Sequence, residues 1–120
     1  MNVTLYGIPN CDQVKKARTW LSEHQIDVHF HDFKKAGISA ELIQPWLKQT
    51  DWQILINRKG TTWRNLPEQE QTRVQDAQSA IACMEQHPSV IKRPVLVVQH
   101  KQRTEILVGF SEENYQRLTG

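Results

Sequence analysis

The spacing of apolar residues changes repeatedly along the first third of the chain. Val3 and Leu5 follow the period of two of a half-buried strand, and we predict this strand over residues 2–6. A turn rich in Gly and Pro leads into a helical period, which predicts a helix over residues 11–24 whose apolar face is formed by Val14, Ala17, Leu21 and the ring of His24. Alternation returns over residues 27–33 and predicts a second strand. Because a helix joins the two strands, we expect them to run parallel.

Helical patterns dominate the middle of the chain. Ser39 is a good N-cap for the helix that follows it, but Pro45 interrupts the pattern, so the helix either kinks there or a new one starts. Residues 51–57 predict a short apolar turn. Residues 67–86 predict one or two helices, and the residues expected on their common face are Val74, Ala77, Ile81 and Met84.

The end of the chain returns to strands. Residues 94–99 are continuously apolar and β-branched, as in a strand buried on both faces, and residues 104–108 predict the next strand. So short a connection predicts an antiparallel hairpin, and Ser111 is the expected N-cap of a last helix. The order is β-α-β, a helical insertion over approximately residues 38–88, then β-β-α. This order predicts one α/β domain over residues 1–120, with a thioredoxin-like fold and a mixed four-stranded sheet.

Composition and charge narrow the range of functions. The chain has 120 residues, 38% hydrophobic and 23% charged, which is ordinary for a globular domain. The net charge of +2 gives no argument for direct nucleic-acid binding. The sequence has neither an apolar run of membrane length nor a signal peptide, so we expect a cytoplasmic protein that does not bind membranes. A reducing compartment argues against a disulfide between its two cysteines.

Cys11 stands at the junction of the first strand and the first helix. The backbone N–H groups and the dipole of a helix N-terminus favour the thiolate, which is the nucleophilic form of cysteine. This position therefore indicates redox or thiol-transfer chemistry. The alternative is a small apolar residue tolerated in a turn. Asp12 opposes a neighbouring thiolate, so other groups would have to outweigh its charge.

Three segments of the chain resemble a known family. The first is Tyr6–Ala17 with its Gly-Ile-Pro-Asn-Cys turn, the second is Leu55–Arg64, and the third is His87–Val97, which is followed by Val-Gly-Phe-Ser at 108–111. In this order they resemble the ArsC/Spx/YffB family of arsenate reductase-like proteins, and the resemblance is closest to the YffB branch. Members of that branch are described as glutathione-dependent thiol reductases.

The resemblance implies roles for particular residues. Cys11 matches the catalytic cysteine, and Arg58 and Arg93 match two oxyanion-binding arginines that would stabilise its thiolate. Pro94 matches the proline that thioredoxin-like folds hold in cis opposite the catalytic cysteine. Without the resemblance, both arginines would be read as ordinary surface cations, although a following proline restricts the backbone of Arg93.

The expected substrate site includes Asn10, Lys15 and Pro94. With no second cysteine near Cys11, an external thiol must resolve an adduct on it, and glutathione is the expected co-substrate. Lys15 and Lys16 could attract its carboxylates, or could belong to a solvated helix face. We expect no tightly bound cofactor. The expected partners are glutathione or a small thiol or disulfide substrate, and glutaredoxin is a further candidate.

The family resemblance leaves two alternative functions, and differences between this chain and other family members count against each of them. Arsenate reductases carry a third arginine near the last hairpin, where this chain has Val-Gly-Phe at 108–110, and they carry His and Ser where it has Gly7 and Val14. Val14 also occupies the place of the second cysteine of Spx regulators, which excludes a local CxxC switch. A Spx-like regulator that binds the RNA polymerase α-subunit is the first alternative function, and a true arsenate reductase is the second.

The remaining candidate residues have simpler interpretations. Cys83 is expected to pack in the core, and the alternative is a resolving cysteine. His29 and His31 have metal-ligand spacing, but no third ligand is apparent, so no metal site is predicted. Trp63 and Arg64 either form a partner surface, or Trp63 anchors the core of the helical insertion.

Overall fold

The computed structural model describes residues 1–118, which form two compact units. The first, called the sheet unit below, combines Met1–Lys35 with the chain from Arg93 onward. The second, called the helical unit, is Ala36–Lys92.

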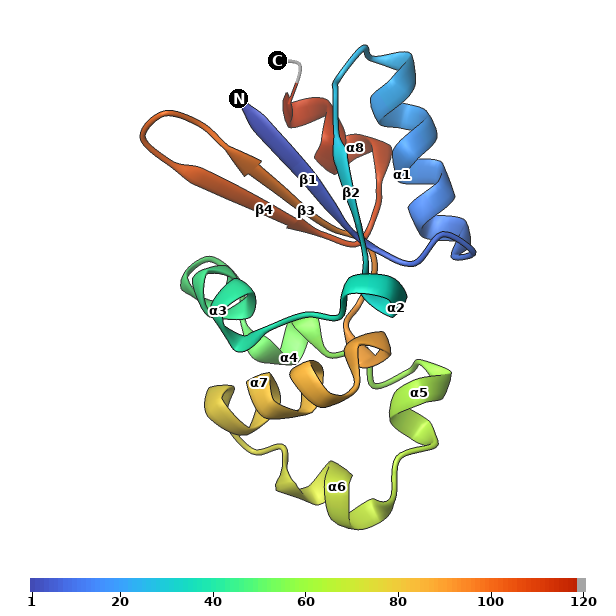
Figure 1. Ribbon diagram of the computed structural model, residues 1–120, viewed down its shortest axis with the longest axis vertical. Coiled ribbons are helices and arrows are strands. Elements are labelled where there is room, and N and C mark those ends of the chain that lie inside the picture. Colours follow the sequence, from blue (N-terminus) through green and yellow to red (C-terminus); the bar gives the residue numbers. More distant parts are fainter. Residues whose placement is uncertain (119–120) are drawn as a thin grey trace. The chain divides into compact units, whose positions relative to one another are not determined.

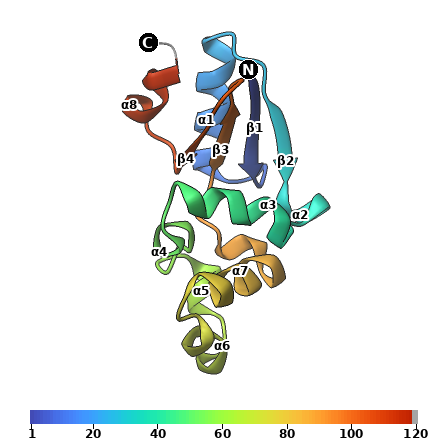
Figure 2. The same cartoon turned by 90° about the vertical axis from the view of Figure 1, so that its left-hand side faces the viewer.

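Four strands of the sheet unit form one sheet in the order β2-β1-β3-β4. The strands are β1 (Asn2–Gly7), β2 (His29–Asp32), β3 (Val95–Gln99) and β4 (Thr104–Val108). β1 pairs parallel with β2 and antiparallel with β3, and β3 pairs antiparallel with β4. Figures 1 and 2 show this arrangement. The mixed four-stranded sheet, the parallel first pair and the final hairpin confirm the predicted fold class.

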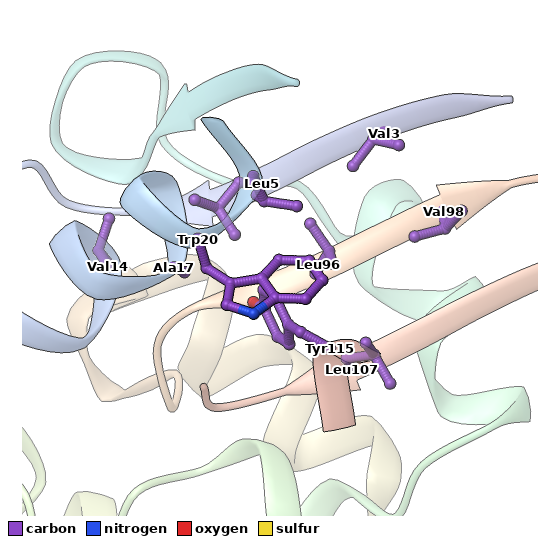
Figure 3. Packing of buried hydrophobic residues seen from close by; sticks show 10 residues of the cluster. Val3, Leu5, Val14, Ala17, Trp20, Leu96, Val98, Leu107 and Tyr115 are labelled. Carbon is purple, nitrogen blue, oxygen red and sulfur yellow. The ribbon is translucent and has the colours of Figure 1, made fainter. Parts of the chain in front are cut away.

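Helices α1 (Asp12–Glu23) and α8 (Glu112–Tyr115) supply the apolar cover of one sheet face, and the 3₁₀ helix η3 (Gln116–Leu118) follows α8. The shared core contains residues from β1, β3, β4 and both helices (Figure 3). Its members are Val3, Leu5, Val14, Ala17, Trp20, Leu21, Leu96, Val98, Leu107 and Tyr115. Alternation along β1 and β3 explains why every second residue of these strands reaches this core.

The buried face of α1 differs in one residue from the face that the sequence predicts. His24 is exposed, and Trp20 is buried in its place at 6% exposure. The His24 ring stacks on the Trp20 ring with centroids 3.7 Å apart. The Tyr115 ring is perpendicular to the Trp20 ring, with the two centroids 5.5 Å apart. Trp20 therefore joins α1 to α8, a role that helical periodicity alone does not reveal.

The helical unit consists of short elements. They are α2 (Phe33–Ala36), which begins in the sheet unit, α3 (Ala40–Ile43), η1 (Gln44–Lys48), α4 (Trp52–Leu55), α5 (Thr61–Arg64), α6 (Glu68–Arg73), α7 (Ala77–Gln86) and η2 (Pro88–Val90). Ser39 caps α3 as predicted, since its Oγ accepts a hydrogen bond from the Leu42 amide at 3.3 Å. Pro45 lies in the first turn of η1, so a new helix starts there.

The 67–86 segment forms two helices, and its buried face agrees only in part with the predicted one. Val74 and Met84 are buried as predicted, whereas Ala77 is exposed and Ile81 is half-buried. Asp76 and Ser79 form a capping box that marks the start of α7, so Ala77 is the first residue of this helix. The buried residues of α7 are Ala80, Cys83 and Met84.

The Tyr115 side chain gives a test of the core. Tyr115 is 0% exposed, and its hydroxyl has no hydrogen-bond partner among the described residues. An unpaired buried hydroxyl costs about 1–3 kcal/mol, so Tyr115→Phe should raise the free energy of unfolding by about 1 kcal/mol. Tyr115→Leu should lower it by roughly 2 kcal/mol because the aromatic packing is lost. Urea unfolding measures both, and a loss of stability in Tyr115→Phe would contradict this reading.

Candidate active site

Cys11 is the N-cap residue of α1, where the chain leaves the β1 strand and turns. Its backbone is extended, with φ −95° and ψ 128°, and its carbonyl accepts the first helical hydrogen bond from Lys15 at 2.9 Å. The turn before it is closed by a 3.4 Å bond from the Cys11 amide to the Ile8 carbonyl. The thiol is partly exposed, so it is accessible to a reactant.

The surroundings of Cys11 lower the pKa of its thiol. Burial acts in the opposite direction and is the largest single influence, but it is outweighed by the Val14 amide, the Arg93 side chain and the Gln13 amide. The sulfur makes no standard capping hydrogen bond, and the amides act by facing it from the first turn. Asp12 is not among the groups that shift this pKa. The thiolate is therefore favoured, as nucleophilic chemistry requires.

Strand pairing brings Arg93 to Cys11. Tyr6 is paired with Val95 across β1 and β3, so Pro94 lies beside the end of β1, from which the Cys11 turn departs. The Arg93–Pro94 peptide bond is cis, and Pro94 is buried. The Pro94 carbonyl accepts a 2.8 Å hydrogen bond from the amide of Gly109 at the end of β4. The Arg93 segment is thus tied to two strands of the sheet.

Gly7 and Val14 pack against each other beneath Cys11. A Cβ atom at position 7 would lie 2.7 Å from a methyl carbon of Val14, which is closer than side chains tolerate. Val14 is itself 0% exposed. Two of the positions at which the family resemblance sets this chain apart from arsenate reductases are therefore coupled by packing. A glycine at the end of β1 lets the first turn of α1 approach the strand.

A groove begins one helical turn beyond Cys11. It has a volume of about 560 Å³ and lies in the sheet unit. Its lining combines basic, acidic and aromatic side chains from α1 and from the segment that enters α8, namely Lys15, Lys16, Thr19, Trp20, Glu23, Phe110 and Glu112. Asn10, the other residue predicted for the substrate site, is exposed in the turn before Cys11.

Arg58 lies in the helical unit, over the rings of Trp52 and Trp63. Trp63 is 9% exposed, which favours the core-anchor interpretation, whereas its neighbour Arg64 is exposed. Sequence reasoning did not single out Trp52. Its signal is the placement of two tryptophans on either side of an Asn-Arg-Lys-Gly turn.

Cys83 differs from Cys11 in its surroundings. It is buried on α7, and burial, followed by the nearby Glu70 carboxylate, raises the pKa of its thiol. Cys83 thus stays a neutral, weakly nucleophilic thiol near neutral pH. It also belongs to the helical unit, whereas Cys11 belongs to the sheet unit.

The predicted histidine pair has separate surroundings. His29 is exposed, and the His31 ring lies 4.8 Å from the Tyr6 ring. Within residues 1–118, no group of three or more His, Cys, Asp or Glu side chains is placed to hold a metal ion. In the same part of the chain, every helix is too short or too polar to cross a membrane.

Comparison with known proteins identifies the family. The family model for the ArsC family matches residues 6–118, and the chain therefore belongs to the ArsC family. The solved structure of the YFFB protein has 45% sequence identity to this chain, and 97% of each chain is covered at a TM-score of 0.86. An arsenate reductase (ArsC) related protein from Brucella melitensis has 47% identity, with 99% of this chain and 95% of that chain covered at a TM-score of 0.70.

A regulator belongs to the same group of relatives. The global transcriptional regulator Spx of Bacillus subtilis is 27% identical over 117 residues, which cover 96% of this chain and 85% of that protein. The predicted membership of the ArsC/Spx/YffB family is thus confirmed. At this level the family includes both arsenate reductase-related proteins and a transcriptional regulator.

The contribution of Arg93 to the Cys11 thiolate can be measured directly. In a Cys83→Ser background Cys11 is the only thiol, and its pKa should lie below the ordinary value. Arg93→Gln should raise this pKa, because a charged donor is replaced by a neutral one. The pH dependence of iodoacetamide alkylation reports the value. Arg18→Gln is the matched control, since Arg18 lies over the Phe30 ring and does not influence Cys11. Equal pKa values in parent and Arg93→Gln would refute the role of Arg93.

Proposed function

We propose that this protein is a glutathione-dependent thiol reductase with Cys11 as its single nucleophile. The observation that carries the proposal is the position of the partly exposed Cys11 thiol at the N-terminus of α1 beside Arg93, surroundings that lower the pKa of this thiol. Val14 occupies the position of a local resolving cysteine, so the adduct on Cys11 must be released by an external thiol. Arg93 would be the catalytic cation that stabilises the Cys11 thiolate. Pro94 would line the substrate site opposite Cys11.

The reaction is a sequence of thiol–disulfide exchanges. The Cys11 thiolate attacks one sulfur of a substrate disulfide, forming a mixed disulfide and releasing the other half as a thiolate. A first glutathione thiolate displaces the remaining half of the substrate and leaves glutathione on Cys11. A second glutathione attacks this adduct, which yields oxidised glutathione and regenerates the Cys11 thiolate. Two glutathione molecules thus supply the two electrons that reduce the substrate.

The groove along α1 supports glutathione as the co-substrate. Glutathione carries two carboxylates and one ammonium group, and the groove offers Lys15 and Lys16 together with Glu23 and Glu112. Lys15 is four residues after Cys11 and therefore on the same side of the helix, one turn away. A tripeptide spans about 10 Å when extended, which is enough to reach from the thiol into the groove. Asn10, which is exposed in the turn before Cys11, would lie beside the glutathione sulfur that is bonded to Cys11.

The first test uses oxidised glutathione. Wild-type protein should acquire one glutathione on Cys11 and none on Cys83, because only Cys11 has a favoured thiolate. The adduct should form faster as the pH rises through the Cys11 pKa. Peptide mass spectrometry identifies the modified residue, with Cys11→Ser as the comparison, and this variant should also lose glutathione-dependent reduction of hydroxyethyl disulfide. An adduct on Cys83 alone would reverse the assignment.

The second test concerns Lys15. Lys15→Glu should raise the KM for glutathione roughly two- to fivefold, which is the scale of one exposed charge contact. The rate with dithiothreitol, which carries no charge, should stay unchanged. Lys35→Glu makes the same change of charge at an exposed position outside the groove and serves as the control. An equal loss with both thiols would mean that Lys15 acts on Cys11 and not on glutathione.

A second candidate function is a Spx-like regulator that binds the RNA polymerase α-subunit. It is favoured by the 27% identity to the Spx regulator over nearly the whole chain. Binding of this kind does not require a second cysteine. Retention on immobilised α-subunit, under both reducing and oxidising conditions, would support it, and absence of retention in both would count against it.

True arsenate reduction ranks below both functions. The Brucella melitensis protein is described as related to arsenate reductase, but the present chain has Val-Gly-Phe where those enzymes carry a third arginine. Val14 leaves no room for their histidine at position 7, because even a Cβ atom there would lie 2.7 Å from a Val14 methyl carbon. Arsenite production dependent on glutathione and glutaredoxin would overturn this ranking and would make glutaredoxin a partner.

A further inference from the structure

Two aromatic residues line the groove along α1, among side chains that are otherwise polar or charged. They are Trp20 and Phe110. Trp20 is buried, whereas Phe110 is half-buried, so Phe110 has the larger apolar surface free for a ligand. A volume of about 560 Å³ is typical of small-molecule sites, in which apolar surface binds a ligand and a few polar groups orient it.

The backbone on both sides of Phe110 is fixed. Gly109 has a φ of 77°, which favours glycine, and its amide donates a 2.8 Å hydrogen bond to the Pro94 carbonyl. Ser111 caps α8, because its Oγ accepts a hydrogen bond from the Asn114 amide at 3.1 Å. Phe110 is thus the single residue between the turn at the end of β4 and the cap of α8, and its place is set before a ligand binds.

Phe110 lies at the end of the sheet that carries the candidate active site. Pro94, which accepts the hydrogen bond from Gly109, directly follows the arginine that acts on the Cys11 thiol. Cys11 and Phe110 also pack against the same core cluster. Lys15 is one helical turn beyond Cys11 and lines the same groove as Phe110. A group bonded to the Cys11 sulfur therefore has the Phe110 ring within reach.

Tyr115 supports both aromatic rings of the groove from the core side. Its ring is perpendicular to that of Trp20, and it meets the Phe110 ring at 79° with centroids 4.8 Å apart (Figure 3 shows Trp20 and Tyr115). Phe110 precedes the N-cap of α8 and Tyr115 is the fourth residue of that helix, which are the positions of a hydrophobic staple. The staple explains the covered part of the Phe110 ring. It does not explain the part that lines the groove.

We propose that Phe110, with Trp20 beside it, is a specificity-determining subsite for an aromatic ring that the disulfide substrate carries next to its reacting sulfur. This pair of residues is called the aromatic subsite below. Aromatic rings pack favourably on one another in offset or edge-on arrangements, and Phe110 has free surface for such a contact. Lys15 and Lys16 in the same groove match a carboxylate on the same substrate. The substrate class is therefore a disulfide of short cysteinyl peptides with an aromatic residue beside the cysteine.

The aromatic subsite deepens the proposed function and rests on it for the reaction, while the preference for a ring is a property of the groove alone. The step concerned is the first exchange. The Cys11 thiolate attacks one sulfur of the peptide disulfide, the S–S bond breaks, one peptide stays on Cys11 as a mixed disulfide and the other leaves as a thiolate. Two glutathione molecules then supply two electrons, release the second peptide as a thiol and leave as oxidised glutathione.

The test compares the disulfides of cysteinyl-phenylalanine and cysteinyl-alanine. Both are symmetrical, so attack on either sulfur gives the same adduct, and they carry the same charges and differ only by a phenyl ring. In a Cys83→Ser background, the rate constant for adduct formation on Cys11 should be roughly three- to tenfold higher for the phenylalanine compound, the scale of one aromatic contact. Intact-protein mass spectrometry without glutathione measures this rate.

Three variants separate recognition of the ring from general packing. Phe110→Leu keeps an apolar staple residue but removes the ring, so the ratio of the two rates should fall to about one. Phe110→Tyr retains a ring and should retain the ratio. Phe30→Leu is the matched control and should also retain it, because Phe30 is likewise half-buried against the core cluster but lies outside the groove. Urea unfolding verifies that each variant is folded.

A binding measurement keeps the aromatic subsite testable without any reaction. In Cys11→Ser, the S-methyl derivative of cysteinyl-phenylalanine should shift the NMR signal of the Trp20 indole N–H group at a lower concentration than the S-methyl derivative of cysteinyl-alanine. The same concentration dependence for both compounds would overturn the subsite.

The outcomes distinguish the aromatic subsite from the proposed function. Equal adduct rates for the two disulfides in the parent protein would overturn the subsite, and so would a ratio that persists in Phe110→Leu or falls equally in Phe30→Leu. Faster reaction of the phenylalanine compound without release by glutathione would support the subsite and remove the glutathione-dependent reductase. Release by glutathione with equal rates for both compounds would support the reductase and remove the subsite.

Discussion

The antiparallel pairing of β1 with β3 is the interaction on which the candidate site depends. One strand ends in the turn that carries Cys11, and the other begins directly after Arg93 and Pro94. Because Tyr6 pairs with Val95, these two chain segments meet at the same end of the sheet although Cys11 and Arg93 are far apart in sequence. A slip of one residue would turn each side chain of β3 to the opposite face and would remove Arg93 from the thiol.

At the same end of the sheet, packing couples two positions, Gly7 and Val14, at which the family resemblance sets this chain apart from arsenate reductases. Gly7 and Val14 are in close contact, so a larger side chain at position 7 would require a different residue at position 14. Gly7 and the buried Val14 therefore form an apolar contact below Cys11, and the Arg93 side chain provides a positive charge near the thiol.

The two cysteines show how different surroundings shift the pKa of the same chemical group, a thiol, in opposite directions. Cys11 lies at a helix N-terminus beside a cation, and the pKa of its thiol is lowered. Cys83 lies on the buried face of a helix near a carboxylate, and the pKa of its thiol is raised.

The sequence by itself determined the order of strands and helices, because apolar periods of two and 3.6 depend only on neighbouring residues. It also determined the place of Cys11, since a Gly-Ile-Pro-Asn turn between a strand and a helix leaves little choice. The tertiary structure decided what periodicity cannot encode. Trp20 and not His24 lies in the core because Trp20 packs against Tyr115 of α8, and tertiary packing buries Ala80 of α7 while Ala77 stays exposed. The approach of Arg93 to Cys11 likewise depends on contacts between residues distant in sequence, which only the folded chain brings together.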